Sequence, residues 1–579
     1  MEQTIMARYQ SWLHSESIPE ELRKELAALR DEEEIADRFY RDLSFGTGGL
    51  RGKMGAGTNR MNVLTVGKAT QGLAWYLKAR TQAPSVCIAY DTRNHSREFA
   101  EHTAKVLCGN GIPVYLFDTV HPTPMLSFAV RYLEASAGVV VTASHNPKEY
   151  NGYKVYGPNG GQITDETAAA IFREIQQCDM MTEVRFLDLS AAEQAGLLHW
   201  IGEDVDAPYF RQVEDLTMRR DLIRWEAKNL KILYSPLHGA GNIPVRRVLR
   251  ELGFSQVTVV PQQELPDGNF PTAPYPNPEE SSVFHLAVEM AKQEEPDLIF
   301  ATDPDCDRIG VLARTADGEY VVLTGNQTGA LLCDYVIRTH RELGTMPTNP
   351  AIIKTIVTSD FGKRICERNG VMMAETLTGF KYIGELADQW ERTGERSFLL
   401  GFEESYGYLA GDFVRDKDGV IASALIAEMA LYHKSQGRTL YQALEALMET
   451  YGCFQDKLVS VILPGQGGQR QIGEIMDRLR VHYHTLLEEE DPAVWEDYQI
   501  SRRTLLPEGQ CEALTLPRSN VVKCVFRSGD WFVLRPSGTE PKIKLYLSVR
   551  GDTLVQAQEK MEHLEKVTSA LLTSPAEEV

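Results

Sequence analysis

The sequence predicts an α/β protein of several domains whose sheets are mostly parallel. Length is the first observation, because a single hydrophobic core rarely grows past about 250–300 residues and this chain has 579. The second is an alternation of short β-branched strands with helices, which begins near Val86 and restarts after Asp204. We expect a helical extension at 1–43, followed by domains at 44–205, 206–321, 322–451 and 452–579.

The composition is that of an ordinary globular protein with an acidic bias. Hydrophobic residues make up 43% and charged residues 24% of the chain, and the formal net charge is -21 with a pI of about 5.2. Nucleic-acid binding requires a basic surface, so we expect no nucleic-acid partner. The N-terminus is polar and no run of about 18 apolar residues occurs, so we expect no membrane partner. Nine cysteines without a CxxC pair indicate free thiols in a reducing, cytoplasmic setting.

Periodicity and end signals predict the individual elements. In the extension, Leu22, Leu26 and Leu29 fall on one helical face, and Ser17 to Glu20 has the spacing of a capping box. For the three α/β domains we predict strands at 86–90, 114–117, 138–141, 230–234, 257–260, 297–301 and 398–400, and helices at 96–110 and 244–252. The proline-rich segment Pro261–Pro278 is long enough to indicate a lid or a connection between domains.

A serine loop follows the strand at 138–141. It reads Thr142-Ala143-Ser144-His145-Asn146-Pro147, and Ser144 would therefore lie at the carboxyl end of a strand, where open α/β sheets bind their ligands. An isolated turn serine would be the simpler interpretation. Upstream, Phe45 to Gly52 is rich in glycine but lacks the third glycine of a dinucleotide fingerprint. It is either a flexible turn or a loop in which Arg51 presents its guanidinium to a phosphate.

Three carboxylates at alternate positions follow the strand at 297–301. Asp303, Asp305 and Asp307 would repel one another unless a cation lay among them, and hard oxygen ligands suit Mg²⁺ or Ca²⁺. An EF-hand is excluded, because Arg308 stands at its sixth position and Arg314 at its twelfth. Three carboxylates under-fill an octahedral site, so we expect a further anionic ligand or water. The alternative is a solvated acidic turn.

Two later loops carry polar side chains in similar positions. In the third domain, Gly401 to Gly407 contains Glu403 and Ser405, which suit the hydroxyls of a sugar, although acid/base chemistry by Glu403 or a helix-capping pair remains open. In the last domain, strands at 531–534 and 543–549 flank Arg535 to Pro541, which has the donors for a phosphate monoester; a simple hairpin is the alternative. A final helix at 553–572 has apolar positions at Leu554, Ala557, Met561 and Leu564.

Taken together, these four loops resemble the motifs of the α-D-phosphohexomutase superfamily, which contains phosphoglucomutases, phosphomannomutases and phosphopentomutases. The loops occur in the family's order and span nearly the whole chain. Phe45–Gly52 and Gly401–Tyr408 most resemble the branch of bacterial α-phosphoglucomutases and animal phosphopentomutase-like enzymes. The metal loop departs from the family in Pro304 and Cys306, where glycines are common, but neither change removes a ligand.

The resemblance implies four domains around a central cleft, three of them similar α/β units and the last a smaller α+β domain. It implies that Ser144 carries a phosphoryl group and that one Mg²⁺ is held by Asp303, Asp305, Asp307 and a phosphoserine oxygen. The substrate contacts that it implies are Arg308, Thr378, Gly379, Glu403, Ser405, Arg535, Ser537, Gly538 and Thr539. Arg51 would offset charge on the transferring group, and His145, Lys154 and Lys381 are the candidates for the general base.

The implied activity is the interconversion of glucose 1-phosphate and glucose 6-phosphate, with glucose 1,6-bisphosphate as intermediate and activator, in a monomer or weak homodimer. The alternatives within the family are a phosphopentomutase, a phosphomannomutase or a sugar-1,6-bisphosphate synthase, since these substrates differ by single hydroxyls or ring size. From other classes, a phosphosugar phosphatase or a non-catalytic binding protein remains open, although the intact serine and aspartates argue against the latter.

Overall fold

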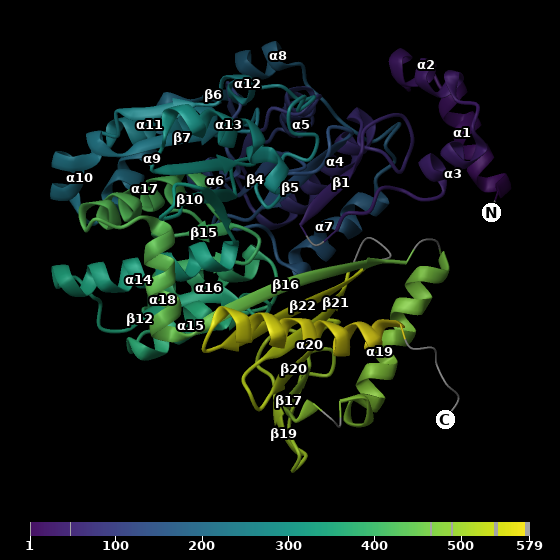
Figure 1. Ribbon diagram of the computed structural model, residues 1–579. Helices are drawn as coiled ribbons and strands as arrows, with labels where there is room; N and C mark the ends of the chain where they lie inside the picture. Colours follow the sequence, from purple (N-terminus) through teal and green to yellow (C-terminus); the bar gives the residue numbers. More distant parts are fainter. Residues whose placement is uncertain (1, 47, 464–465, 488–489, 538–541, 574–579) are drawn as a thin grey trace.

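The computed structural model describes residues 2–46, 48–463, 466–487, 490–537 and 542–573, which form four sheets with surrounding helices (Figure 1). Three mixed sheets follow one another along the chain, and the fourth sheet, at the C-terminal end, is antiparallel throughout. The predicted fold class, three α/β domains followed by an α+β domain, is confirmed. No helix in the described ranges has the length and apolar character needed to cross a membrane.

Three short helices at the N-terminus lie at the outer edge of the first domain (Figure 1). They are α1 (Glu2–His14), α2 (Glu20–Ala28) and α3 (Glu32–Phe39). Leu26 is fully buried, and Leu22 and Leu29 pack against the same cluster, as the helical face predicted. The predicted capping box was wrong: Pro19 is the N-cap of α2, and no side chain caps that end.

The first domain is a six-stranded mixed sheet in the order β1-β5-β4-β2-β3-β6. Along β2, Cys87 and Ala89 face one hydrophobic cluster, whereas Val86, Ile88 and Tyr90 face another, so both sides of the sheet are buried. The elements are β1 (Gly49–Lys53), α4 (Val63–Arg80), β2 (Val86–Tyr90), α5 (Ser96–Gly109), β3 (Val114–Phe117), α6 (Thr123–Tyr132), β4 (Ala137–Val141), β5 (Tyr150–Tyr156), α7 (Asp165–Gln177), α8 (Leu189–Gln194), β6 (Leu198–Ile201) and α9 (Glu203–Leu216).

The second and third domains repeat the central part of the first. The second contains α10 (Arg220–Glu226), η1 (Ala227–Asn229), β7 (Lys231–Ser235), α11 (Asn242–Glu251), β8 (Gln256–Val259), α12 (Pro261–Glu264), η2 (Ser281–Phe284), α13 (His285–Glu294), β9 (Leu298–Thr302), β10 (Ile309–Arg314) and β11 (Tyr320–Leu323). The third contains α14 (Gly325–Leu343), β12 (Pro350–Thr355), α15 (Asp360–Arg368), β13 (Met372–Thr376), α16 (Phe380–Thr393), β14 (Ser397–Glu403), β15 (Gly407–Leu409), α17 (Gly419–Ser435) and α18 (Leu440–Tyr451).

All three sheets share one feature of strand order. The chain runs from the middle strand to a parallel neighbour on one side and then crosses to the other side, giving β4-β2-β3, β9-β7-β8 and β14-β12-β13. Each domain therefore has a topological switch point, where loops at the carboxyl ends of parallel strands form a ligand site. The serine, metal and sugar loops follow β4, β9 and β14.

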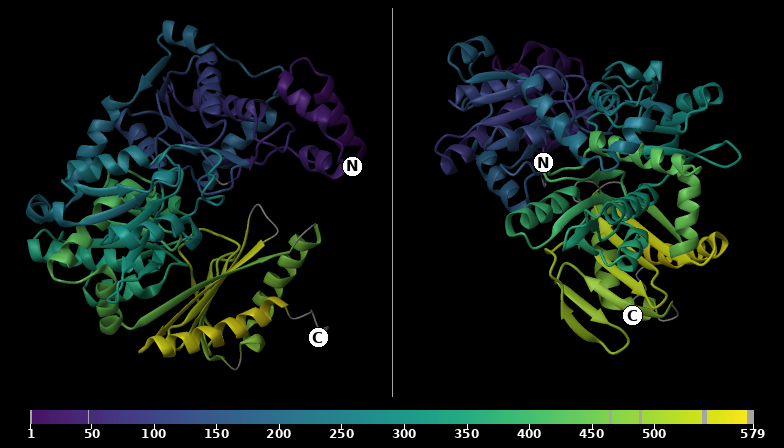
Figure 2. Two further views of the ribbon diagram at one scale, coloured as in Figure 1. Left: turned by 45° about the horizontal axis from the view of Figure 1, so that its top comes forward. Right: turned by 90° about the vertical axis from the view of Figure 1, so that its left-hand side faces the viewer.

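The fourth domain is a seven-stranded antiparallel sheet with two long helices (Figure 2). The helices pack on the face that carries Phe532 and Leu534, and the opposite face, with Trp531 and Val533, packs against Ile356 of the third domain. The elements are β16 (Cys453–Ile462), α19 (Gln466–Leu486), β17 (Pro492–Asp497), β18 (Arg502–Leu505), β19 (Gln510–Ala513), β20 (Val522–Phe526), β21 (Trp531–Pro536), β22 (Lys542–Gly551) and α20 (Leu554–Thr573).

The predicted apolar face of the last helix is partly wrong. Ala557, Met561 and Leu564 are buried, but Leu554 is 52% exposed because it is the first residue of α20 and lies beyond the edge of the core.

A buried glutamate in α17 has a predictable effect on stability. Glu428 accepts hydrogen bonds from the backbone N–H groups of Met218 and Arg219, yet burial raises its pKa to about 7. The folded protein therefore binds more protons than the unfolded chain between about pH 4.5 and 7, so this residue lowers stability as pH rises through that window, by about 3 kcal/mol in total.

We expect the Glu428→Gln variant to lack this loss, because an amide can keep the two backbone contacts without a charge. Thermal unfolding of both proteins between pH 5 and 8 tests it: the melting temperature of the wild type should fall relative to the variant as pH rises. The exposed Glu445, changed to glutamine, is the control. Parallel pH profiles for wild type and Glu428→Gln would contradict the prediction.

Candidate active site

Ser144 lies in the loop after β4, in contact with the metal loop of the second domain. Its Oγ donates a hydrogen bond to Asp303 Oδ2 at 2.8 Å, and its backbone N–H donates to Thr142 Oγ1 at 2.8 Å. The side chain is 3% exposed, and the backbone adopts φ 53°, a conformation that few residues other than glycine adopt. Residues 159 positions apart therefore meet here, and the serine hydroxyl is held against a carboxylate.

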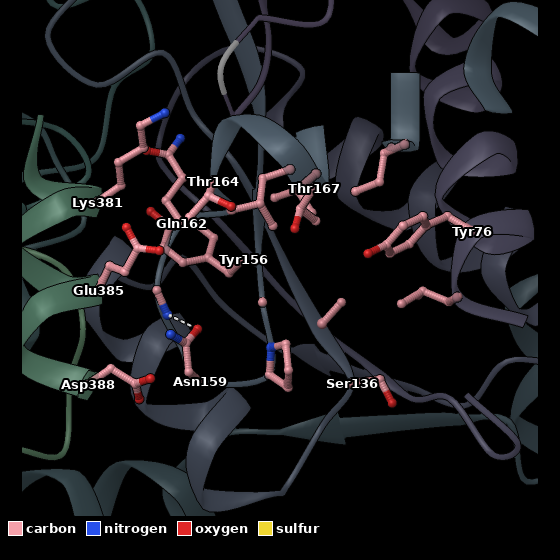
Figure 3. Close-up of a pocket in the computed structure, with 18 of the residues that line it drawn as sticks. Tyr76, Ser136, Tyr156, Asn159, Gln162, Thr164, Thr167, Lys381, Glu385 and Asp388 are labelled. Atoms are coloured by element: carbon pink, nitrogen blue, oxygen red, sulfur yellow. Dashed lines mark hydrogen bonds between the residues drawn. The ribbon is translucent and has the colours of Figure 1, made fainter. Parts of the chain in front are cut away.

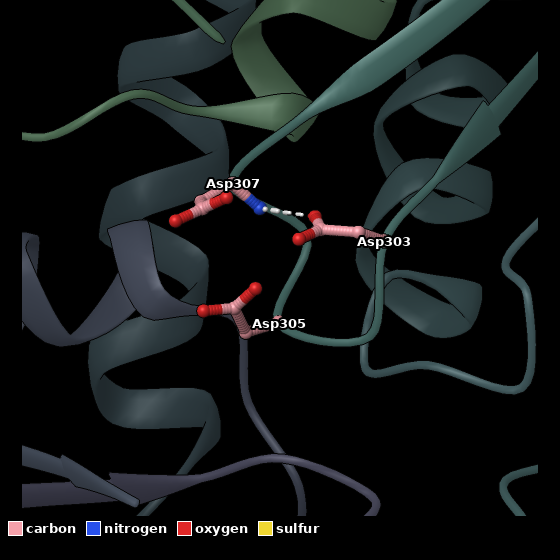
Figure 4. Close-up of side chains that lie close together, drawn as sticks. All are labelled: Asp303, Asp305 and Asp307. Carbon is pink, nitrogen blue, oxygen red and sulfur yellow. Dashed lines mark hydrogen bonds between the residues drawn. The ribbon is translucent and has the colours of Figure 1, made fainter. Parts of the chain in front are cut away.

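The three aspartates converge within the metal loop (Figure 4). One oxygen from each of Asp303, Asp305 and Asp307 lies within 4.8 Å of the others, and all three side chains are buried. Asp305 Oδ1 and Asp307 Oδ1 have no hydrogen-bond partner among the described residues. Burial and the charges of the other two aspartates raise the pKa of Asp303 well above its usual value. Hard, buried and partly unsatisfied oxygen donors of this kind fit Mg²⁺.

Cationic side chains surround the aspartates from other domains. Lys154 Nζ lies 2.9 Å from Asp305 Oδ2, and Lys417 Nζ lies 3.0 Å from Asp307 Oδ2. Although burial opposes it, Asp305 and Asp307 raise the pKa of Lys154 above its usual value. Lys154 therefore keeps its proton in this arrangement, which suits the neutralisation of negative charge better than the acceptance of a proton.

His145, unlike Lys154, has a lowered pKa. Its Nδ1 lies 3.2 Å from Ser144 Oγ, and burial, together with the charges of Arg308 and Arg51, lowers its pKa well below the usual value. A neutral imidazole beside the serine hydroxyl can accept a proton.

Two arginines lie near the serine loop and the aspartates. Arg51, on β1, is exposed and donates to Asn146 Oδ1 at 3.3 Å. Arg308 forms an ion pair with Glu279, which lies directly after the proline-rich segment. That segment also contacts the first domain, because Asn94 donates to Asn269 Oδ1 at 3.2 Å. The segment lies between β8 and β9 of one sheet, so the predicted connection between domains was wrong: it is part of the second domain and packs against the first.

The last residue of β14 and the first residue of the loop after it present two adjacent carboxylates. Glu403 is 5% exposed, and Ser405 is half-buried in the same loop. Glu404 accepts hydrogen bonds from Thr358 Oγ1 at 2.9 Å and Thr355 Oγ1 at 3.3 Å. Burial and the charge of Glu403 raise the pKa of Glu404 to about 7. This loop therefore offers both an acceptor and a group that carries a proton near neutral pH.

Lys381 lies at the boundary between the first and third domains. Its Nζ is 2.6 Å from Asp165 Oδ1 at the start of α7, and Thr378 and Gly379 precede it at the N-terminal end of α16. The side chain lines a cavity of about 300 Å³ in which Glu385 and Asp388 of α16 face the first domain (Figure 3). None of Ser144, Asp303, Asp305 and Asp307 lines this cavity.

The phosphate loop is described only in part. Arg535 and Ser537 are half-buried, and the Ser537 backbone N–H donates to the Lys542 carbonyl at 2.7 Å, closing the loop between β21 and β22. Gly538 and Thr539 lie outside the described residues, so their predicted roles stay predictions. Burial and the charge of Glu404 raise the pKa of Tyr546 on β22, while the charge of Arg535 opposes this rise, so the strand pair lies near the sugar loop.

Three residues that contact the candidate site were missed by the sequence interpretation. Lys417 pairs with Asp307, and Thr123 Oγ1 donates to Asp305 Oδ2 at 2.9 Å, while Arg93 contacts the serine loop. Arg93 follows the end of β2 by three residues, and this place at the carboxyl end of a strand could have identified it as a candidate. Cys306, where glycine is common, adopts φ 51°, so the family's preference for glycine has a conformational reason here.

Comparisons with known proteins identify the family of the chain. Four models described as phosphoglucomutase/phosphomannomutase domains match the chain: α/β/α domains I, II and III at residues 42–181, 207–318 and 324–451, and the C-terminal domain at 485–564. A phosphoglucomutase of Staphylococcus haemolyticus is 38% identical over 521 residues, which cover 90% of this chain and 93% of that protein.

Solved structures share the fold at lower identity. The phosphoglucomutase parafusin from Paramecium, in an open form, has a TM-score of 0.69 at 16% identity and covers 93% of this chain and 97% of its own. An N-acetylphosphoglucosamine mutase of Aspergillus fumigatus, in complex with GlcNAc-6P and magnesium, has a TM-score of 0.50 at 13% identity, covering 92% and 97%. With four domain models matched in order and a relative at 38% identity over nine-tenths of the chain, the protein belongs to the phosphoglucomutase/phosphomannomutase family.

Proposed function

We propose that this protein is a phosphoglucomutase that interconverts α-D-glucose 1-phosphate and glucose 6-phosphate. The observation that carries the proposal is the contact of Ser144 Oγ with Asp303 at 2.8 Å, beside two aspartate oxygens that accept no hydrogen bond from the described residues. A serine hydroxyl next to a cation site is the arrangement required for a phosphoserine whose negative charge is neutralised. The similarity to a bacterial phosphoglucomutase over most of the chain supports glucose as the sugar.

Asp303, Asp305 and Asp307 would hold one Mg²⁺, together with an oxygen of phosphoserine 144. When bound, the ion would neutralise charge that develops on the transferring phosphoryl group. Lys154 and Lys417, already paired with Asp305 and Asp307, would contribute positive charge to the same place.

The chain's own residues would carry out the remaining tasks. Arg535, Ser537, Gly538 and Thr539 would bind the phosphate that does not react, while Glu403 and Ser405 would accept hydrogen bonds from the sugar hydroxyls. His145 would accept the proton of the attacking sugar hydroxyl as the phosphorus–oxygen bond to Ser144 breaks and the bond to the sugar oxygen forms, and it would pass that proton to the departing Ser144 Oγ, 3.2 Å from its Nδ1. The resulting glucose 1,6-bisphosphate would turn over and return its other phosphoryl group to Ser144.

A coupled assay tests the proposed activity. With Mg²⁺ and catalytic glucose 1,6-bisphosphate present, we expect kcat/KM for glucose 1-phosphate to exceed the values for mannose 1-phosphate and ribose 1-phosphate by at least about tenfold, because a misplaced hydroxyl leaves a polar group of the site unpaired. Equal values for the ribose compound would favour a phosphopentomutase. Release of inorganic phosphate without isomerisation would identify a phosphatase.

We also propose a cytoplasmic location and a simple oligomeric state for this enzyme. All nine cysteines are free, and eight of them are buried, which suits a reducing compartment such as the cytoplasm. We infer that the enzyme acts as a monomer or weak homodimer, and sedimentation of the purified chain across a range of concentrations measures this directly.

A further inference from the structure

Arg93 lies beside the serine loop because of the strand order in the first domain. β2 and β4 are parallel neighbours, with Tyr90 paired to Val141, so the segments that follow them leave the sheet side by side. Arg93 follows β2 by three residues, and Ser144 follows β4 by three. The two residues thus meet at the switch point of this sheet, although 51 positions separate them.

The guanidinium of Arg93 contacts four backbone carbonyls of the serine loop. One terminal nitrogen donates to the carbonyls of Pro147 at 3.0 Å and Tyr150 at 3.3 Å. The other donates to the carbonyls of Ser144 and Asn146. The side chain is fully buried, so water does not compete for these bonds. A planar fork of donors is the arrangement that can satisfy several carbonyls at once, and a lysine cannot reproduce it.

Asp91 holds the same loop through the side chain of Thr142. Its Oδ2 accepts a hydrogen bond from Thr142 Oγ1 at 2.6 Å, and that hydroxyl accepts the backbone N–H of Ser144 at 2.8 Å. Asp91 Oδ2 also lies 3.2 Å from Arg93 Nε. Both the N–H and the carbonyl of Ser144 are therefore fixed by one buried network, which we call the Asp91–Arg93–Thr142 clamp.

The clamp acts on a residue whose conformation needs support. Ser144 adopts φ 53°, and a side chain in this region persists only when its surroundings hold it there. The conformation directs Ser144 Oγ toward Asp303. Without the clamp, the loop could relax toward a more common backbone conformation, and the oxygen would leave the metal loop.

We propose that Arg93 is a positioning residue for phosphoryl transfer: by holding the carbonyls of the serine loop it aims the phosphoserine at the sugar hydroxyl rather than at water. The inference rests on the proposed mutase activity and deepens it. Misplacement of a reacting group by about 1 Å can cost roughly 100-fold in rate, so a loosened loop should slow transfer to the sugar and let hydrolysis of the phosphoserine compete.

The test compares Arg93→Lys with Arg60→Lys. Arg60 is also buried in the first domain, where it bonds Asp37 and Glu34 of the N-terminal extension, so its replacement reports the general cost of removing a buried guanidinium. We expect Arg93→Lys to lower kcat about 100-fold with KM changed by less than about threefold. Inorganic phosphate released per isomerisation should rise at least about tenfold, whereas Arg60→Lys should leave this ratio unchanged.

Thr142→Val provides a second variant that keeps the buried charges and changes the clamp by one hydroxyl. It should raise the phosphate ratio in the same direction, which keeps the inference testable where Arg93→Lys does not fold. The test uses Arg93→Lys, or Thr142→Val where only that variant folds. If this variant releases no more phosphate per isomerisation than Arg60→Lys does, the inference is overturned and the proposed function is not. A wild-type protein without mutase activity would overturn it together with the proposed function.

Discussion

Replacement of Ser144 by alanine is expected to lower mutase turnover by roughly 10⁴-fold or more, because the variant has no oxygen to carry the phosphoryl group. The fold should persist, since Ser144 is a loop residue whose hydroxyl makes two hydrogen bonds, to Asp303 and His145, each with a net value on the order of 1 kcal/mol. The measurement is kcat on glucose 1-phosphate with catalytic bisphosphate, alongside circular dichroism and intact mass. Mass spectrometry should show no phosphorylated species in the variant after incubation with bisphosphate.

Ser136 supplies the matched control. It lies at the opposite end of β4, where its Oγ accepts a hydrogen bond from the backbone N–H of Ser85 at 3.3 Å. Ser136→Ala should retain wild-type kinetics. A Ser144→Ala protein with turnover near that of Ser136→Ala would remove Ser144 from the role of nucleophile and end the case for a phosphoserine mechanism.

Replacement of Asp307 by asparagine is expected to weaken Mg²⁺ binding and activity by roughly 100-fold or more, since it removes one of three charged ligands from a buried site. Asp307 Oδ1 accepts no hydrogen bond from the described residues, while Oδ2 contacts Lys417 and Lys154. Asparagine preserves shape and one oxygen, so the effect reports charge at the site rather than a cavity. Calorimetric titration with MgCl₂ measures affinity, and activity at increasing Mg²⁺ measures the functional consequence.

The control for this prediction is Asp416→Asn. Asp416 carries the same charge, also lies near Lys417 and accepts a hydrogen bond from Tyr156, but it does not belong to the aspartate cluster. We expect its Mg²⁺ affinity to remain within a few-fold of the wild type. Equal loss of affinity in both variants would show that general electrostatics, rather than coordination by Asp307, determines cation binding.

Much of the fold was predictable because its signals are local. A short β-branched run closed by asparagine, proline and glycine, as at 138–141, marks the end of a buried strand, and the structure has β4 at Ala137–Val141. The strands predicted at 86–90 and 114–117 also occur at those residues. Ser144 and the three aspartates were therefore predicted at the carboxyl ends of strands. The structure then brought the two groups together, with Ser144 hydrogen-bonded to Asp303.

The pKa values of the candidate general bases were not predictable from local sequence. Lys154 and His145 were equal candidates for the general base on their sequence alone. Asp305 and Asp307 raise the pKa of Lys154, whereas burial and nearby arginines lower that of His145. The two residues differ because pKa depends on burial and on charges from other domains, and neither quantity is encoded within a few residues of the titrating group.

By itself the sequence determined the class of fold, the positions of the strands that precede the four loops and the types of polar side chain that follow them, since each of these depends on neighbouring residues. Only the tertiary structure decided which loops meet. The contact of Lys154 with Asp305 spans 151 positions, that of Thr123 with Asp305 spans 182, and the contacts of Arg93 follow from the order of two strands. Strand order results from the packing of the whole domain around its core, and so no local pattern could have specified these partners.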